Sequence, residues 1–195
     1  MWKLFVMAVS LLLPAAEAHG LPVAQAEYSA VRQIEYSGGV LQQQLYHSFG
    51  KERIEMNVEG MQRVMILRPD LGKFWHLMPV FESYSEIAAH QASQMRGEMP
   101  EDVSIELMGS EHLDGINTIK YRILLPDKSV GGFIWFTAEQ IPLQMHFVSK
   151  EGSHESRIRM KLTDLKLGAQ DPALFELPQG LKPMPAMRQR FEGDE

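Results

Sequence analysis

Short segments of alternating apolar and polar residues make up much of the chain. A two-residue period of this kind is typical of β-strands that have one face in the core and the other in water. Strands are therefore predicted wherever the alternation is clear, with their apolar positions facing inward. These positions are Ile54, Met56, Val58, Ile119, Tyr121, Ile123, Leu143, Met145, Phe147, Ile158, Met160 and Leu162.

Turn signals separate many of these segments at roughly the 8–12-residue spacing of a strand meander. Because such short connections cannot cross over a sheet, neighbouring strands are predicted to be antiparallel. The turns are predicted at residues 37–39, 48–51, 59–60, 69–72, 126–127 and 150–153.

The strand predicted after the turn at 69–72 does not alternate. Its residues Phe74, Trp75, Leu77 and Met78 are apolar at almost every step, and Pro79 then ends the pairing. A half-buried strand would show polar residues at every second position. This segment therefore raises the question of what covers its apolar surface.

One helix is predicted directly after this strand. Ser83 and Glu86 have the spacing of a capping box, and Gly97 is a suitable end signal. Within this helix one face would carry Tyr84, Ala88, Ala92 and Met95. A short helix is also predicted near residues 21–28, and a single capped turn at 171–175.

These elements predict an α+β fold. About eight strands would make a sheet roughly 40 Å wide, whereas a twelve-residue helix is only about 18 Å long. Such a sheet would curl to hide its surplus apolar face. The predicted architecture is a curled antiparallel sheet that forms an incomplete barrel, with its apolar concave face covered by one to three helices. The pattern alone favours a packed core inside it over a cavity.

The first 18 residues are predicted to be a secretory signal. They combine Lys3, an apolar run that ends at Leu13 and a small-residue cleavage site at Ala16 and Ala18; cleavage after Ala26 is an alternative. The apolar run is too short for a membrane anchor, so the mature chain is not expected to span a membrane. Residues 19–185 are predicted to form one domain and residues 186–195 a mobile tail.

Charge and cysteine content narrow the setting and the partners. The formal net charge is −6 and no basic tract is present, which argues against nucleic acid as a partner. Without any cysteine the chain can form neither a disulfide nor a cysteine-linked lipid anchor. An exported protein of this kind is expected in a bacterial periplasm, or secreted.

No motif for catalysis, metal or cofactor binding stands out. The seven histidines show no metal-ligand spacing, and residues 111–115, which contain His112, suit a solvated hairpin better than a metal site. No nucleophile elbow, phosphate loop or dinucleotide fingerprint is present. One basic strip is conceivable on the outer side of the sheet, although ordinary solvent-facing charges are the simpler interpretation. Its residues would be Lys120, Arg122, Arg157, Arg159 and Lys161.

Four motifs follow one another along residues 27–185: RPDLGKFWHLMPVFESYSEI, GSEHLDGINTIKYRI, GGFIWFTAEQIPLQM and DPALFELPQGLKP. In this order they resemble an uncharacterised family of exported bacterial proteins that is similar to the periplasmic lipoprotein carriers, the LolA-like superfamily.

This resemblance implies a periplasmic, non-enzymatic binding protein that holds a lipid or a lipoprotein acyl chain in an apolar cavity, without any cofactor. The alternative is an envelope-stress sensor or scaffold with a packed core and a protein partner. No stretch matches the functional residues of the true carriers. The predicted cavity residues are Ile54, Met56, Phe74, Trp75, Leu77, Met78, Ala88, Ala92, Met95, Tyr121, Ile123, Trp135, Met145, Phe147 and Met160.

Overall fold

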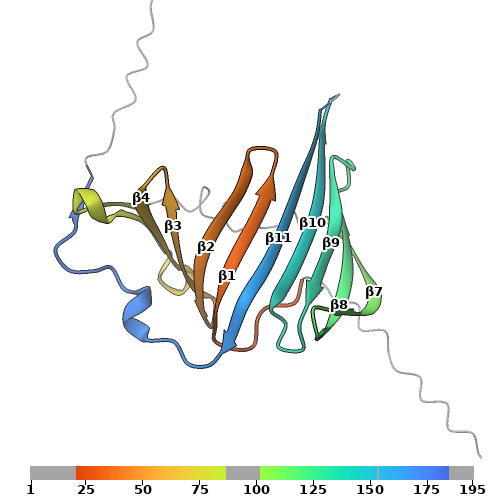
Figure 1. The fold of residues 1–195 in the computed structure, drawn as a ribbon, viewed down its shortest axis with the longest axis horizontal. Helices are drawn as coiled ribbons and strands as arrows, with labels where there is room; N and C mark the ends of the chain where they lie inside the picture. The colour runs from red at the N-terminus through yellow and green to blue at the C-terminus, as the bar shows by residue number, and fades with distance from the viewer. Residues whose placement is uncertain (1–20, 87–101, 153, 185–195) are drawn as a thin grey trace, which may run out of the picture.

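The computed structural model describes residues 21–86, 102–152 and 154–184, and Figure 1 shows their arrangement. Twelve strands and three short 3-10 helices make up this part of the chain. The 3-10 helices are η1 (Pro69–Leu71), η2 (Pro79–Phe81) and η3 (Pro172–Phe175). The strands are β1 (Tyr28–Tyr36), β2 (Gly39–Ser48), β3 (Lys51–Val58), β4 (Met61–Arg68), β5 (Lys73–Met78), β6 (Ser83–Glu86), β7 (Ser104–Leu113), β8 (Ile116–Leu124), β9 (Val130–Phe136), β10 (Pro142–Glu151), β11 (His154–Leu167) and β12 (Lys182–Pro183).

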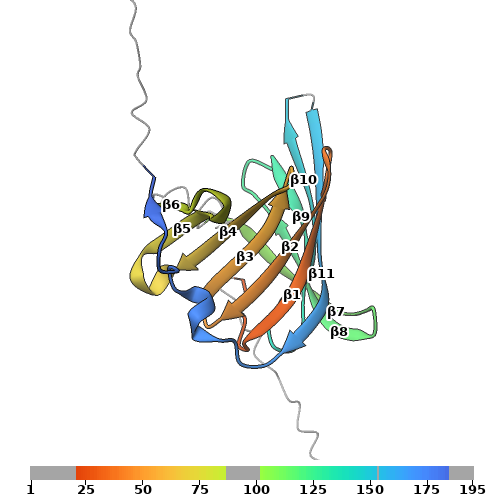
Figure 2. The same ribbon diagram turned by 60° about the vertical axis from the view of Figure 1, so that its left-hand side comes forward.

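All the strands belong to one sheet with the order β12-β6-β5-β4-β3-β2-β1-β11-β10-β9-β8-β7. Every neighbouring pair is antiparallel except β12 and β6, which run parallel. The sheet is open and strongly curled, as Figures 1 and 2 show, so that it has a concave inner face and a convex outer face. Wide twisted sheets curl in this way because the strand twist accumulates from one strand to the next.

The prediction of an α+β fold with helices over the concave face is wrong. The residues that the structure describes form one open curled sheet, and they contain no α-helix. The short helix predicted near residues 21–28 is also absent, because residues 21–27 have no regular structure and Tyr28 already begins β1.

The helix predicted from Ser83 starts instead as strand β6. Ser83 pairs with Met78 and Tyr84 pairs with Leu77, so the backbone of this segment extends the sheet. The 3-10 turn η2 reverses the chain between β5 and β6. Glu82 at the end of this turn adopts a left-handed conformation with a φ of 45°. Sheet pairing therefore overrides the local capping signal. The rest of the predicted helix, from Ile87 to Gly97, lies outside the described residues.

The predicted strand alternation agrees with most of the sheet. Leu45, Ile54 and Met65 face one another across β2, β3 and β4 on the inner face. Two of the predicted inward positions are exposed, Ile119 at 41% and Ile158 at 46%. No segment among the described residues covers these two positions.

The C-terminal segment covers part of the outer face. Figure 2 shows it passing from β11 along the outer side of β3 and β4 to β12, beside β6. Its η3 turn is capped as predicted for residues 171–175, since Asp171 Oδ1 accepts a hydrogen bond from the Ala173 amide at 2.9 Å. Arg68 secures the segment by donating to Glu176 Oε1 at 2.5 Å and to the Phe175 carbonyl at 3.4 Å.

Candidate binding groove

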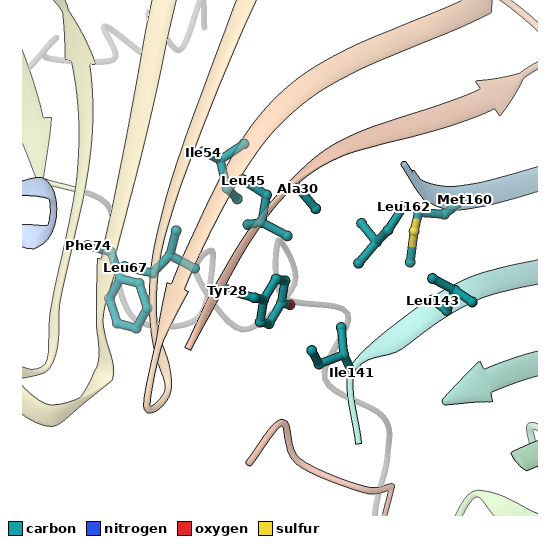
Figure 3. Close-up of a cluster of buried hydrophobic side chains, with 10 residues drawn as sticks. All are labelled: Tyr28, Ala30, Leu45, Ile54, Leu67, Phe74, Ile141, Leu143, Met160 and Leu162. Atoms are coloured by element: carbon teal, nitrogen blue, oxygen red, sulfur yellow. The ribbon is translucent and has the colours of Figure 1, made fainter. Parts of the chain in front are cut away.

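The inner face of the sheet carries a continuous apolar wall. Ten buried side chains from two arms of the curled sheet form one cluster. In Figure 3 the side chains of β4 and β5 lie on one side of a shared space, and those of β10 and β11 lie across it. The cluster consists of Tyr28, Ala30, Leu45, Ile54, Leu67, Phe74, Ile141, Leu143, Met160 and Leu162.

A cavity of about 400 Å³ opens beside this wall. Small-molecule sites in proteins have volumes of roughly 300–1,000 Å³ and are mostly apolar with a few polar groups. The cavity matches that description, because most of its lining is aliphatic, aromatic or methionine. Its lining residues are Arg32, Ile34, Gln43, Glu52, Ile54, Met65, Ile66, Leu67, Phe74, Trp75, Pro142, Met145 and Met160.

One arginine lies within this largely apolar lining. Arg32 stands on β1 and donates its Nε–H to Gln43 Oε1 on β2 at 2.7 Å. Gln43 is itself buried, with 5% of its surface exposed, and its Nε2 lies 3.8 Å from the sulfur of Met56. Burial lowers the pKa of Arg32, while the nearby charge of Glu52 raises it. The guanidinium therefore stays protonated, as arginine does throughout proteins.

A second polar group lies at one end of the apolar wall. The rings of Tyr28 and His47 stack with their centroids 5.0 Å apart, and His47 Nδ1 lies 3.6 Å from Glu52 Oε1. Burial, with help from the charge of Glu52, raises the pKa of the Tyr28 hydroxyl. Tyr28 consequently stays neutral and acts in the wall as an aromatic surface.

A further arginine is present on the inner face of β4. In the strand register Arg63 pairs with Met56 on β3, and Arg32 on β1 pairs with Gln43 on β2. Met56 and Gln43 also pair with each other, so the four residues form one row across the sheet. The Nε of Arg63 is buried and has no hydrogen-bond partner in the described part of the chain. The pKa of His76 on β5 is lowered, first by burial and then by the charge of Arg63.

Most of the predicted cavity residues lie on the inner face. Ile54, Phe74, Met145 and Met160 border the cavity directly, and Met56 packs against the same cluster. Strand alternation puts the half-buried Met78 on the same side as Phe74. A second inner cluster, built around Ile123, Ile134 and Phe136, is joined by three further residues of the prediction. The predicted residues in that second cluster are Tyr121, Ile123 and Phe147.

Two of the predicted cavity residues on the non-alternating strand have their side chains on the outer face of the sheet. Trp75 and Leu77 pack with Val64 and Ile66 on the outer face, under Leu177 and Leu181 of the C-terminal segment. Trp75 also borders the cavity, as predicted. Strand β5 is thus buried on both faces, which explains its continuous apolar sequence. The remaining predicted residues Ala88, Ala92 and Met95 lie outside the described residues.

Trp135, another predicted cavity residue, also faces outward. Its Nε1–H donates to Glu111 Oε2 at 2.7 Å, and the ammonium of Lys120 lies 4.7 Å from its ring centroid. Lys120 also lies 4.6 Å from the ring of Phe133 and 3.3 Å from Glu111 Oε2. The hydrogen bond from Trp135 and the charge of Lys120 lower the pKa of the Glu111 carboxyl. Cation–π contacts and a paired carboxylate thus cover this tryptophan.

The basic residues predicted for the outer side of the sheet do gather there. Arg122, Arg157 and Arg159 border a hollow of about 670 Å³ on the outer face. Most of the predicted cations have an acidic partner, as in the 2.8 Å pair of Lys161 with Asp114. Such exposed pairs are typical of an ordinary charged surface.

Sequence reasoning missed the polar groups inside the groove. Arg32 lies in the segment AVRQIEY between Ala30 and Ile34, at a position where the strand period requires an inward side chain. Gln43 occupies the equivalent position between Leu41 and Leu45. Charged or polar residues at core positions of a clear alternation are the signal that would have revealed them.

The described residues hold no cluster of acidic or histidine side chains with the geometry of a metal site. Among the same residues, no helix has the length and apolar character needed to cross a membrane. The groove combines an apolar wall with a few fixed polar groups.

Comparison with known proteins supports the fold. No family model and no curated protein matches the chain. An uncharacterized conserved protein from Thermus thermophilus matches with a TM-score of 0.57 and 14% identity over 82% of this chain and 90% of that chain. A chain of the Pseudomonas aeruginosa MucA/MucB complex matches with a TM-score of 0.55 and 14% identity over 82% of this chain and 58% of that chain.

A weaker match is the Mycobacterium tuberculosis lipoprotein LppX, with a TM-score of 0.42, 13% identity and coverage of 70% of this chain and 85% of that chain. Its TM-score is too low to support an argument. The two stronger matches show that the open curled sheet is a known fold. At these identities they show the fold alone.

Proposed function

We propose that the protein binds a lipid or lipoprotein acyl chain along the inner face of its curled sheet, as a non-enzymatic carrier in the cell envelope. The observation that carries this proposal is the cavity of about 400 Å³ beside the apolar wall. Methionines Met65, Met145 and Met160 border it, and flexible methionine side chains adapt to chains of variable shape.

The energetics favour a long alkyl ligand. Each methylene moved from water into an apolar site contributes about 0.8 kcal/mol, while association costs roughly 4–15 kcal/mol in lost freedom and desolvation. A chain of about ten carbons would contribute about 8 kcal/mol, which is within the range of that cost, so long chains are expected to bind and short ones are not. Two additional methylenes are expected to tighten binding by about tenfold, until the groove is filled.

The envelope location rests on the predicted signal in residues 1–18 and on the absence of cysteine. The fold match to a chain of the MucA/MucB complex favours a second candidate, a protein that binds an envelope protein partner. In that case the inner face would be a packed core without a ligand.

A binding experiment separates these two functions. The purified protein is delipidated and titrated with decanoic and dodecanoic acid, with displacement of the neutral dye N-phenyl-1-naphthylamine as the signal and native mass spectrometry to count bound chains. A carrier binds one chain and prefers the longer acid. Absence of both dye and acid binding by the folded protein would exclude the carrier and favour the scaffold.

A matched pair of variants places the ligand. Met145 borders the cavity, whereas Arg159 lies on the outer face of the neighbouring strand with no ion pair among the described residues. Met145→Trp is expected to fill the groove and weaken dodecanoic acid binding at least tenfold, and Arg159→Trp to leave it unchanged. Urea unfolding of both variants verifies that they fold. Equal effects of the two changes would remove the inner face as the site.

A further inference from the structure

Arg32 is unusual because it places a permanent charge in an apolar groove. Ile34, Ile54, Met145 and Met160 border the same cavity. Bringing a guanidinium into such surroundings is unfavourable unless its hydrogen-bonding groups find partners. A structural role would be expected to use all of its donors.

Its hydrogen bonds leave much of the guanidinium available. The Nε–H is taken by Gln43 Oε1 at 2.7 Å, which fixes the plane of the group. The two Nη groups make no hydrogen bond with the described residues. They form the end of the guanidinium that binds a carboxylate or phosphate with two parallel hydrogen bonds.

Among the residues that the structure describes, the inner face around Arg32 carries two arginines, Arg32 and Arg63, and one acid, Glu52. Arg63 lies on the same face, and its buried Nε has no partner in the described part of the chain. Burial first, and then the charge of Arg63, lower the pKa of His76 on the neighbouring strand. Glu52 borders the same cavity with its Oε1 3.6 Å from His47 Nδ1, and its charge raises the pKa of Arg32 against the effect of burial. One further anion would balance the second arginine.

We propose that Arg32 recognises the acidic head group of the bound lipid, a carboxylate or a phosphate, while the acyl chain lies along the apolar wall. Gln43 is then a positioning residue that aims the guanidinium, and Arg63 adds to the attraction from the same face. This inference rests on the proposed function, since it names the class of ligand that the groove selects. A purely apolar groove would instead select lipids with a neutral head group, because an ionised head group loses its hydration there without compensation.

Ligands with the same chain and different head groups test this directly. Decanoic acid, decyl phosphate and decan-1-ol are titrated at pH 8, where both acids are ionised, against the neutral dye N-phenyl-1-naphthylamine. The wild-type protein is expected to bind at least one of the two acids about tenfold more tightly than the alcohol, since hydrogen bonds to charged groups are the strong ones. The preferred acid identifies a fatty acid or a phosphorylated lipid as the source.

Three variants assign the preference to Arg32. Arg32→Gln keeps a donor for Gln43 and removes the charge, so it should invert the preference in favour of decan-1-ol. Arg32→Lys retains the charge and should retain part of the preference for the acid. Arg159→Gln makes the same change on the outer face of the sheet and should leave the ratio unchanged, and urea unfolding confirms that each variant is folded.

The possible outcomes are distinct. If no ligand and no dye binds, the proposed function fails. If acids and alcohol bind wild type equally, or if Arg32→Gln weakens all three ligands by the same factor, the groove is a lipid site but Arg32 does not read the head group. An inverted ratio in Arg32→Gln, with an unchanged ratio in Arg159→Gln, establishes the inference.

Discussion

Trp75 and Trp135 show two ways of burying an aromatic side chain on the outer face of one sheet. Trp75 on β5 is 9% exposed and lies in an apolar cluster under Leu177 and Leu181, which belong to a distant segment of the chain. Trp135 on β9 is 4% exposed, and its described neighbours are Lys120, Glu111, Phe133 and His146.

The two sites teach that an apolar run in a strand does not by itself indicate a ligand cavity. Segments FWHLM and FIWF are both almost continuously apolar in the sequence. In the first, a chain segment supplies the second layer; in the second, the long side chain of Lys120 covers the ring and keeps its charge near water. Phe74 and Trp75 of the first run border the cavity, whereas Ile134 and Phe136 of the second run belong to a separate inner cluster.

The largest effect is expected from truncating these tryptophans. Trp75→Ala should lower the free energy of unfolding by about 3–5 kcal/mol, because it leaves a cavity under a fixed segment. Trp135→Ala should cost less by at least about 1 kcal/mol, because the flexible Lys120 can collapse into the space. Urea unfolding measures both. A larger loss for Trp135→Ala would show that the charged cover is the more rigid one.

A glycine pair on β9 gives the next effect. A Cβ at Gly132 would lie 2.0 Å from the backbone oxygen of His146 and 2.8 Å from the Phe147 ring, so the strands would have to separate. At Gly131 the nearest atom is the tip of Leu124, at 2.9 Å, which can rotate away. Gly132→Ala should destabilise by about 1–3 kcal/mol and Gly131→Ala by less. Equal thermal shifts for the two variants would contradict the close approach of β9 and β10.

Leu177 belongs to the C-terminal segment that covers the outer face of β5, so truncating it tests the same packing as Trp75→Ala. It is half-buried against Trp75 and its neighbours, so Leu177→Ala should cost about 1–2 kcal/mol in the free energy of unfolding. Since the inner face is untouched, binding of N-phenyl-1-naphthylamine should stay within about twofold of wild type. A strong loss of dye binding would mean that the ligand lies under the C-terminal segment instead of in the groove.

The smallest effect concerns His76. Its pKa is lowered, first by burial and then by Arg63, so the folded state favours the neutral ring. The stability contributed by the neutral ring is fully present above the ordinary histidine pKa of about 6.5. It is lost as the pH falls through the lowered pKa of the folded state. His76→Gln should therefore show a smaller stability loss than wild type between pH 7.5 and pH 5, by less than about 1 kcal/mol because the ring is partly solvated. An identical pH dependence in chemical unfolding would contradict this shift.

The strands and turns follow from local signals, and so they were predictable. The two-residue period and the turn residues at 37–39 or 59–60 act within a few residues of themselves. Whether Ser83–Glu86 forms a helix or a strand depends on its pairing with β5 and with β12. Strand β12 lies far along the chain, at Lys182–Pro183. A capping signal carries no information about such partners.

The candidate groove was predictable only in part for the same reason. Strand alternation correctly places Ile54, Met145 and Met160 on one face. It cannot decide which side of a continuous run such as Phe74–Trp75 faces inward, because both sides are apolar. The outer side is identified only by the C-terminal segment that covers it. The polar groups Arg32 and Gln43 were visible in the sequence as exceptions to the alternation.

Photo-crosslinking tests the central claim, that an acyl chain lies along the inner face of the sheet. Dodecanoic acid with a diazirine near its methyl end is bound to the protein, irradiated and mapped by peptide mass spectrometry. Labels are predicted on inner-face residues such as Ile54, Met145 and Met160, which border the cavity, and excess dodecanoic acid should prevent them. Labels confined to the outer hollow, around Phe133 and His146, would contradict the account.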